Sequence, residues 1–241
     1  MRYAVLSDIH GNLESLRAVL ADAADRADAI LCLGDTVGYG ADPGPCVELV
    51  AERGAMAVAG NHEYAVAGRL GLEWFNRYAR AAAEWTVAQL GDDCRQYLGA
   101  LPLVAEIGDA TLVHASPGRP DEWEYVLTAE DGLAALEGFS TRLCFVGHSH
   151  VPGVWSIGSS GPAYEGGATT VELEPGRRYL VNVGSVGQPR DRDARAAYAV
   201  WCVDERRIDL RRVAYDVEGA RRKILDAGLP TFLADRLRAG R

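Results

Sequence analysis

Short apolar runs in this chain end, one after another, at residues of the kind that bind metal ions. All five histidines lie in the clusters at these ends. Imidazole is the commonest protein ligand for metals, and ligands in open α/β sheets collect beyond the carboxyl ends of strands. We therefore expect the clusters to converge on one metal site. They are Asp8-Ile9-His10, Gly34-Asp35, Gly60-Asn61-His62-Glu63, His114 and Gly147-His148-Ser149-His150.

The spacing of apolar residues predicts alternating strands and helices in the first sixty residues. Strands are expected over residues 3–6, 29–33 and 55–59, each a short apolar run. A helix should follow Asn12, a suitable N-cap, and another should cover residues 46–53 before Gly54. Such alternation implies parallel strands.

The rest of the chain changes to a largely β pattern. Thr128 and Asp131 are placed for a capping box, and Gly108-Asp109 signals a hairpin. We interpret the glycine-rich segment 158–167 as a surface loop. The expected helices cover 76–90, 92–98, 128–137 and a terminal stretch interrupted by Gly228 and Pro230. The expected strands cover 103–107, 110–114, 143–146, 154–157, 169–173, 179–183, 198–203 and 208–215.

Length and composition limit the class of protein. A chain of 241 residues can bury a full core, so we predict one α/β domain over residues 1–241, built as two mixed sheets with outer helices. The formal charge of −9 makes nucleic acid an unlikely partner, because a polyanion is repelled at long range. The basic region 206–241 is interpreted as a solvated face. A homo-oligomer is left open.

Cysteine usage and hydropathy predict the compartment. The five cysteines form no CxxC pair, which favours buried thiols in a reducing environment. The sequence shows no cleavable signal and no run of about 18 apolar residues. We expect a cytoplasmic protein with no membrane contact.

The ligand types suit a pair of metal ions. Two cations about 3.5–4 Å apart can share one carboxylate and one hydroxide, which then attacks a phosphoryl group. Asp8 and His10 can serve one ion, because alternate side chains of an extended turn point the same way, and His150 can return to that ion. Asp35 is the natural bridge. The second ion would take Asn61, His114 and His148.

The ordered set resembles the calcineurin-like metallophosphoesterase family, whose motifs are D-x-H, GD, GNH-D/E, a lone H and GH-x-H. Residues 182–190, Asn-Val-Gly-Ser-Val-Gly-Gln-Pro-Arg, also resemble a segment of its bacterial phosphodiesterase-like branch. The resemblance implies a four-layer αββα sandwich and hydrolysis of a small or nucleotide-like phosphoester, with diesters preferred to monoesters. It implies two divalent metals, with Mn, Fe, Zn, Co and Ni all compatible with the ligands.

In the family that the chain resembles, the residue equivalent to His62 is catalytic. It protonates the leaving group or stabilises the transition state without binding metal. Glu63 would either orient His62 or act as a first-turn acid of a helix. Arg190 would either line the substrate site or form a surface ion pair with Asp191 or Asp193. We expect Trp123 and Tyr125 to anchor a loop in the core, with a lid over the site as the alternative.

One departure from the family narrows the substrate class. Protein phosphatases and symmetrical dinucleoside tetraphosphatases of the superfamily carry an arginine shortly after the GD motif. This chain has Gly38-Tyr39-Gly40 there, so we do not expect it to act on the substrates of those enzymes. A phosphomonoesterase, a nuclease and a noncatalytic metal-binding scaffold remain as alternatives, although a nuclease would need a basic groove.

Overall fold

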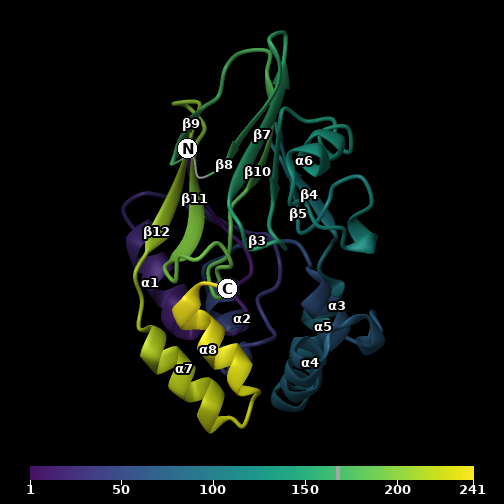
Figure 1. Ribbon diagram of the computed structural model, residues 1–241, viewed down its shortest axis with the longest axis vertical. Helices are drawn as coiled ribbons and strands as arrows, with labels where there is room; N and C mark the ends of the chain where they lie inside the picture. Colours follow the sequence, from purple (N-terminus) through teal and green to yellow (C-terminus); the bar gives the residue numbers. More distant parts are fainter. Residues whose placement is uncertain (167–168) are drawn as a thin grey trace.

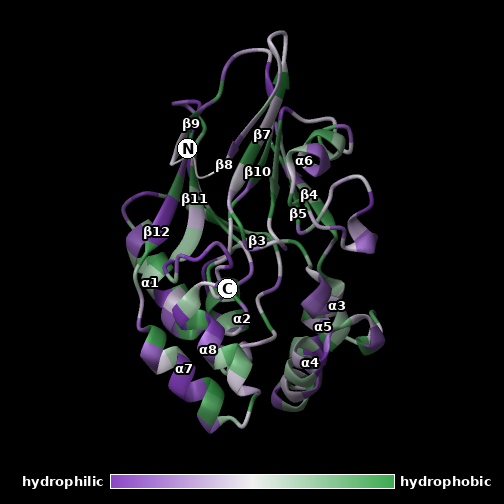
Figure 2. Ribbon diagram, viewed as in Figure 1, coloured by the Kyte–Doolittle hydropathy of each residue, from purple (hydrophilic) through white to green (hydrophobic). Residues whose placement is uncertain are grey.

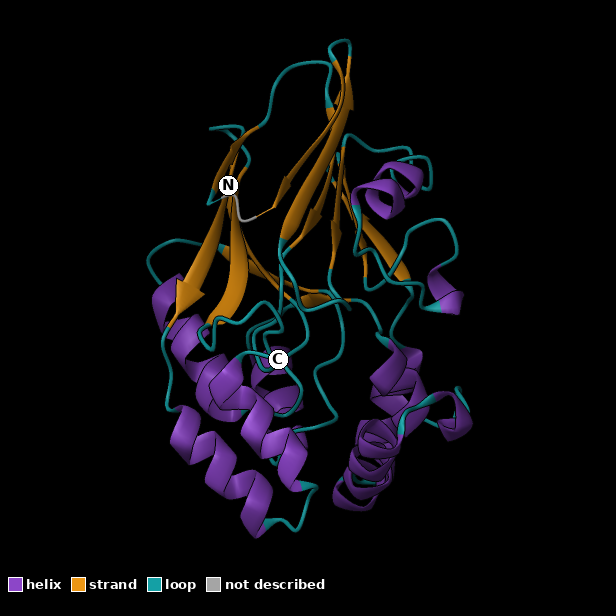
Figure 3. Ribbon diagram, in the orientation of Figure 1, coloured by secondary structure: helices purple, strands orange, loops and turns teal. Residues whose placement is uncertain are grey.

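Two six-stranded mixed sheets form the centre of the computed structural model, which describes residues 1–166 and 169–241 (Figures 1 and 3). In the first sheet, three parallel strands adjoin three antiparallel ones. The predicted sandwich of two mixed sheets with outer helices is confirmed. The order of the first sheet is β3 (Met56–Ala57), β2 (Ala29–Cys32), β1 (Arg2–Leu6), β11 (Ala196–Cys202), β12 (Arg207–Val213) and β9 (Thr170–Glu172).

The second sheet also has a parallel centre. Strands β5, β6 and β10 run parallel, and antiparallel neighbours flank them on both sides. Within each sheet, the parallel strands therefore have their carboxyl ends at the same edge. The order is β4 (Val104–Ile107), β5 (Ala110–Val113), β6 (Leu143–Val146), β10 (Arg178–Asn182), β7 (Gly153–Gly158) and β8 (Gly161–Gly166).

Helices cover the outer faces and the lower edge of the sheets. Helix α1 (Leu13–Ala23) packs on the first sheet, and α6 (Ala129–Ala135) packs on the second (Figure 1). Among the described residues, no helix has the length and apolar character needed to cross a membrane. The remaining helices lie below the sheets: α2 (Pro43–Glu52), α3 (Asn61–Val66), α4 (Arg77–Gln89), α5 (Asp92–Ala100), α7 (Val217–Asp226) and α8 (Thr231–Ala239), with 3-10 turns at Leu72–Trp74 and Pro120–Glu122.

The main apolar core lies between the two sheets. Val5 and Leu31 of the first sheet share a buried cluster with Phe145 and Val181 of the second. Central strands of both sheets are buried on both faces, which is why they read as continuous apolar runs in the sequence (Figure 2). This rigid centre fixes the loops that follow the strands.

Most predicted elements are confirmed, including both predicted caps. Asn12 Oδ1 accepts a hydrogen bond from the backbone N–H of Ser15 at 3.1 Å, and Thr128 and Asp131 form the reciprocal capping box. The helix predicted over residues 46–53 begins earlier, because Pro43 suits the first turn. The terminal helix is two helices, separated at Gly228 with φ of 70°.

The prediction of a surface loop over residues 158–167 was wrong for most of the part that the structure describes. Gly161–Gly166 forms β8, which pairs with β7 in an antiparallel hairpin, and residue 167 lies outside the described residues. The strand is glycine-rich and mostly exposed, so its sequence lacks the apolar alternation that predicts a strand. The short helix α3 was also missed, because its six residues are too few for a helical period.

Candidate metal centre

Five strand ends supply the predicted site residues. Loops after β1 and β2 carry Asp8 and Asp35, and Asn61 is the first residue of α3, which follows β3. Loops after β5 and β6 carry His114 and the pair His148 and His150. The structure brings the aspartates and histidines together as a buried set. The convergence expected from the sequence is thus observed.

Several of these residues have unusual backbone conformations. Asp8, His10, Asp35, His148 and His150 all have positive φ, between 51° and 62°. Non-glycine residues rarely adopt this left-handed region, and such strain concentrates at functional sites. The turns direct these side chains into one buried space instead of continuing the strands.

Asp8, His10 and His150 form the first group of ligand-type atoms. His10 Nε2 lies 3.1 Å from His150 Nε2, and His150 Nε2 lies 3.1 Å from Asp8 Oδ1. The opposite ring nitrogens, His10 Nδ1 and His150 Nδ1, lie 3.0 and 2.6 Å from the backbone carbonyls of Val37 and Gln188. Because a carbonyl only accepts, each Nδ1 carries the proton and each Nε2 of a neutral ring presents a lone pair.

The second group contains Asp35, His114 and His148. His114 Nε2 lies 3.1 Å from His148 Nδ1 and 3.3 Å from Asp35 Oδ2, and His114 Nδ1 faces the carbonyl of Leu33 at 2.8 Å. Asp35 Oδ2 is also 3.7 Å from His10 Nε2 in the first group. The Asp35 carboxylate therefore faces both groups.

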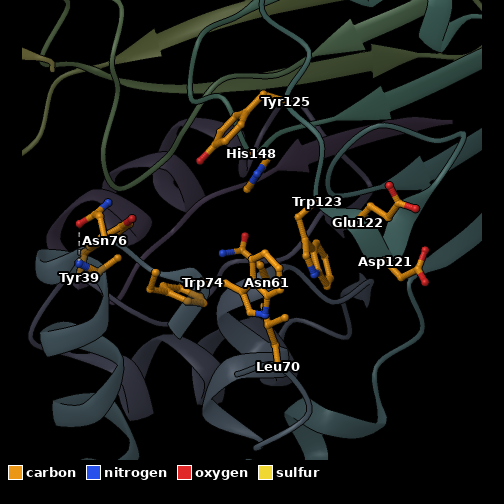
Figure 4. A pocket seen from close by; sticks show the side chains of 12 residues that line it. Tyr39, Asn61, Leu70, Trp74, Asn76, Asp121, Glu122, Trp123, Tyr125 and His148 are labelled. Atoms are coloured by element: carbon orange, nitrogen blue, oxygen red, sulfur yellow. Dashed lines mark hydrogen bonds between the residues drawn. The ribbon is translucent and has the colours of Figure 1, made fainter. Parts of the chain in front are cut away.

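Asn61 adjoins the second group at the wall of a cavity. It lines this cavity together with His148, and Figure 4 shows the two side chains near each other. Asn61 Oδ1 and His148 Nε2 are buried without a hydrogen-bond partner among the described residues. Buried polar atoms normally have hydrogen-bond partners, so the unpaired amide oxygen of Asn61 is suited to bind a cation.

The donor set fits metal ions. In the first group, His10 Nε2, His150 Nε2 and Asp8 Oδ1 converge, and with both rings neutral and protonated on Nδ1 no hydrogen lies between these atoms. Asp8 Oδ1 has no hydrogen-bond partner among the residues that the structure describes. Such an arrangement is repulsive unless a cation lies among the three atoms. Two nitrogens at right angles on one ion, each about 2.1 Å from it, would be about 3 Å apart, close to the spacing observed.

The protonation states of the metal-free site support the same interpretation. Burial lowers the pKa of His150 to about 3, with the nearby Arg190 charge adding to the effect, and burial likewise lowers the pKa of His148 to about 3. Burial opposes protonation of His114 too, but the Asp35 and Asp8 carboxylates outweigh it and raise the pKa of His114 to about 9. A metal bound there would replace the proton on His114.

His62 lies beside the metal-type ligands. Its backbone N–H donates to Asp35 Oδ1 at 2.9 Å, and its ring packs against His10 with centroids 4.9 Å apart. Nδ1 of His62 is buried against Gly38, where a Cβ would overlap the ring, so that glycine is required. Burial lowers the pKa of His62 to about 3, and the ring is neutral at pH 7 in the metal-free protein. His62 also lies close enough to His10 and Asp35 to be a ligand.

Glu63 holds the backbone around Asp35. Its carboxylate is fully buried and accepts hydrogen bonds from the N–H groups of Asp35 at 2.7 Å, Thr36 at 2.6 Å and Gly60 at 2.8 Å. The first-turn position in a helix is confirmed, since Glu63 caps α3. The hypothesis that it orients His62 is replaced by a role in positioning the Asp35 loop.

We expect Glu63→Gln to destabilise the metal-free protein by about 1–3 kcal/mol. The side-chain NH2 group of glutamine would replace a carboxylate oxygen that accepts a hydrogen bond from a buried backbone N–H, and that N–H would lose its acceptor. The measurement is the free energy of unfolding in urea. Glu52→Gln, at an exposed position of α2, is the matched control and should change little. An unchanged unfolding free energy for Glu63→Gln would show that these three hydrogen bonds do not hold the loop.

Sequence reasoning missed two residues that brace the site. Asn182 Nδ2 donates to the carbonyl of Gly147 at 2.7 Å, and Ser185 Oγ donates to the carbonyl of Asp8 at 2.8 Å. Both residues are fully buried in the segment that resembles the phosphodiesterase-like branch. That resemblance was the available signal, and the structure gives it a physical basis, since the segment connects the loops after β1 and β6.

A cavity of about 620 Å³ opens beside the second group. Trp74 and Trp123 lie on either side of Asn61 in Figure 4, with Asp121 and Glu122 beyond Trp123. The ring of Tyr125 stacks on His148 with centroids 4.0 Å apart. The expected role of Trp123 and Tyr125 as core anchors was therefore wrong, because both line the cavity and Tyr125 is 49% exposed.

Arg190 forms neither of the surface ion pairs considered for it. Asp191 pairs with Arg212 and Asp193 with Arg195, whereas Arg190 Nη2 donates to Gln188 Oε1 at 2.9 Å. The Arg190 backbone N–H also donates to the carbonyl of His150 at 3.3 Å. Its half-buried guanidinium is therefore adjacent to the first group of ligand-type residues.

Comparisons with known proteins agree with this geometry. The family model described as calcineurin-like phosphoesterase matches residues 1–152. An uncharacterized protein of Methanocaldococcus jannaschii is 40% identical, and the alignment covers 99% of this chain and 98% of that protein.

Solved structures share the fold over the whole chain. A metallophosphoesterase from Sphaerobacter thermophilus is 43% identical, with a TM-score of 0.87 and coverage of 100% of this chain and 99% of that one. A hypothetical protein from Pyrococcus horikoshii is 21% identical, with a TM-score of 0.81 and coverage of 100% and 98%. The second likeness bears on the fold alone.

Proposed function

The chain belongs to the calcineurin-like phosphoesterase family, and we propose that it is a phosphodiesterase that cleaves small or nucleotide-like diesters with two divalent metal ions bound at this centre. The observation that carries the proposal is the pair of buried ligand groups with Asp35 facing both. In the proposed arrangement Asp8, His10 and His150 would hold one ion, Asn61, His114 and His148 would hold the other, and Asp35 would contribute to both.

The remaining residues have roles around the phosphoryl group. Bound cations would neutralise the phosphoryl charge and lower the pKa of an attacking water. His62, beside both Asp35 and His10, would hydrogen-bond the leaving oxygen and, where the substrate's charge favours protonation of the ring, donate a proton to it. Glu63 would keep Asp35 in place through the backbone.

Two features support diesters over monoesters. No lysine or arginine is among the described residues that line the 620 Å³ cavity, and five of its twelve lining residues are tyrosine, tryptophan or phenylalanine. An organic group suits such a wall better than additional phosphate charge. The position where family phosphatases carry an arginine holds Gly38-Tyr39-Gly40 instead.

The test compares bis(p-nitrophenyl) phosphate with p-nitrophenyl phosphate in the presence of added Mn²⁺. We expect kcat/KM to be at least about tenfold higher for the diester, a difference of about 1.4 kcal/mol in transition-state stabilisation. Chelation by EDTA should abolish both activities. A higher value for the monoester would make the protein a phosphomonoesterase, and no activity with any metal would favour the scaffold.

The nuclease alternative is separated by competition. Asp121 and Glu122 at the cavity and the net charge of −9 disfavour a polyanion. Single-stranded DNA should therefore inhibit diester hydrolysis less than a mononucleotide at equal phosphate concentration. Stronger inhibition by DNA would support a nuclease.

A further inference from the structure

A second cavity, of about 390 Å³, adjoins the aromatic one. Tyr39, Asn76 and Tyr125 line both cavities and so form the wall between them. Three arginines line the second cavity. Arg77 is exposed and donates to the hydroxyl of Tyr78, whereas Arg190, from the loop after β10, and Arg236, from α8, are half-buried. The cavity therefore brings positive charge to the side of the metal centre that holds His150.

No side-chain carboxylate neutralises either guanidinium. Among the described residues, no aspartate or glutamate lies within ion-pair distance of Arg190 or Arg236. Arg190 Nε is buried without a hydrogen-bond partner, and the guanidinium lies 5.8 Å from the centre of the Tyr39 ring. Arg236 is half-buried, donates through Nε to the main-chain oxygen of Arg241, the last residue of the sequence, and its guanidinium lies 5.3 Å from the centre of the Phe232 ring.

Other arginines in the second half of the chain do have carboxylate partners. Arg238 pairs with Glu218, Arg221 with Asp235, and Arg211 with Asp22. Burial, and to a smaller extent the neighbouring charge of Arg190, lowers the pKa of Arg236 to about 10. Holding such charges in a half-buried cavity costs free energy, and an anion bound between them would recover it.

We propose that Arg190 and Arg236 form a subsite for a second phosphate group of the substrate, distinct from the ester that is cleaved. The inference rests on the proposed function. Two guanidinium forks match the charge and the oxygens of a phosphate dianion, whereas a carboxylate would neutralise only one of them. The substrate would then place an organic group against Trp74 and Trp123 and its second phosphate in the arginine cavity.

The test uses three p-nitrophenyl phosphodiesters whose other alcohol is propyl, 3-carboxypropyl or 3-phosphonopropyl. The phosphonate is chosen because its C–P bond resists hydrolysis. We expect kcat/KM for the phosphonopropyl ester to exceed that for the propyl ester by about 10- to 100-fold, with the carboxypropyl ester between them. Equal values for the propyl and phosphonopropyl esters would overturn the subsite, although the proposed function would stand.

In Arg236→Gln, kcat/KM for the phosphonopropyl ester should exceed that for the propyl ester by only about threefold or less, because one of two charge-assisted contacts is lost. Arg222→Gln is the matched control, since Arg222 is exposed on α7 and does not line this cavity, and it should keep the preference. If Arg236→Gln lowers kcat/KM equally for all three esters, Arg236 acts on the cleaved ester or on folding, and the inference is wrong.

A binding measurement separates this inference from the proposed function. Propylphosphonate is titrated calorimetrically into metal-free protein, where no metal can hold it. We expect millimolar binding that Arg236→Gln weakens about tenfold, because a charge-assisted contact is lost. This result would support the subsite even if none of the esters were hydrolysed. No binding, or equal binding by Arg236→Gln, would overturn it even if the diesters were cleaved.

Discussion

Replacing Asp35 with Asn is expected to remove most bound metal and to lower diester hydrolysis by at least about 10³-fold, because stabilisation of developing charge supplies much of the rate enhancement in such reactions. The Asp35 carboxylate lies 3.7 Å from His10 Nε2 and 3.3 Å from His114 Nε2, nearer to the second group than Asp8, whose Oδ1 is 3.9 Å from His114 Nε2. Metal content by mass spectrometry and kcat/KM for bis(p-nitrophenyl) phosphate measure the two effects.

The fold should survive this substitution. Asparagine has nearly the same shape, and its Oδ1 can still accept the hydrogen bond from the His62 N–H. Asp25→Asn, at an exposed position, removes the same charge and should keep full activity. Two equivalents of metal with retained turnover in Asp35→Asn would refute the bridge.

The second large effect is expected for His62→Ala. Loss of a general acid typically costs about 10²–10⁴-fold, and the cost falls when the leaving group needs no proton. We expect both metals to remain bound, a large loss on an alkyl phosphodiester, and a smaller loss on a nitrophenyl diester. The ratio of the two losses is the measurement.

The structure makes this comparison necessary. A ring that is neutral in the metal-free protein can donate an N–H hydrogen bond without transferring a proton, and His62 lies close enough to His10 and Asp35 to be a ligand. His62→Gln keeps an N–H donor but cannot take up a proton. If His62→Ala loses the same factor in activity on both esters and His62→Gln restores that activity, His62 acts by electrostatic stabilisation. If His62→Ala loses a bound metal, His62 is a ligand.

The central part of the fold was predictable because each signal is local. An apolar run and the polar residue that ends it are contiguous in sequence, so Leu6 with Asp8, and Val146 with His148, identified the strand ends directly. The convergence then followed from parallel strands sharing one edge. Asn12 and Thr128 were likewise predictable, because a cap acts on N–H groups within its own helix.

What the sequence could not supply depends on tertiary contacts. Glu63 finds its partners at Asp35 and Thr36 in another loop, and no local pattern indicates that. Arg236 was interpreted as one residue of a solvated basic region, and only the packing of α8 places it with Arg190. Strand β8 was missed because cross-strand pairing with β7 stabilises a glycine-rich segment that has little strand propensity of its own.

The most direct test of the proposed metal centre is a crystal structure of the protein loaded with Mn²⁺, with the ions located by anomalous scattering at the manganese edge. We predict two ions, one bound by Asp8, His10 and His150 and the other by Asn61, His114 and His148, with the Asp35 carboxylate between them. A single fully occupied ion, or one ion bound by both His148 and His150, would contradict this arrangement.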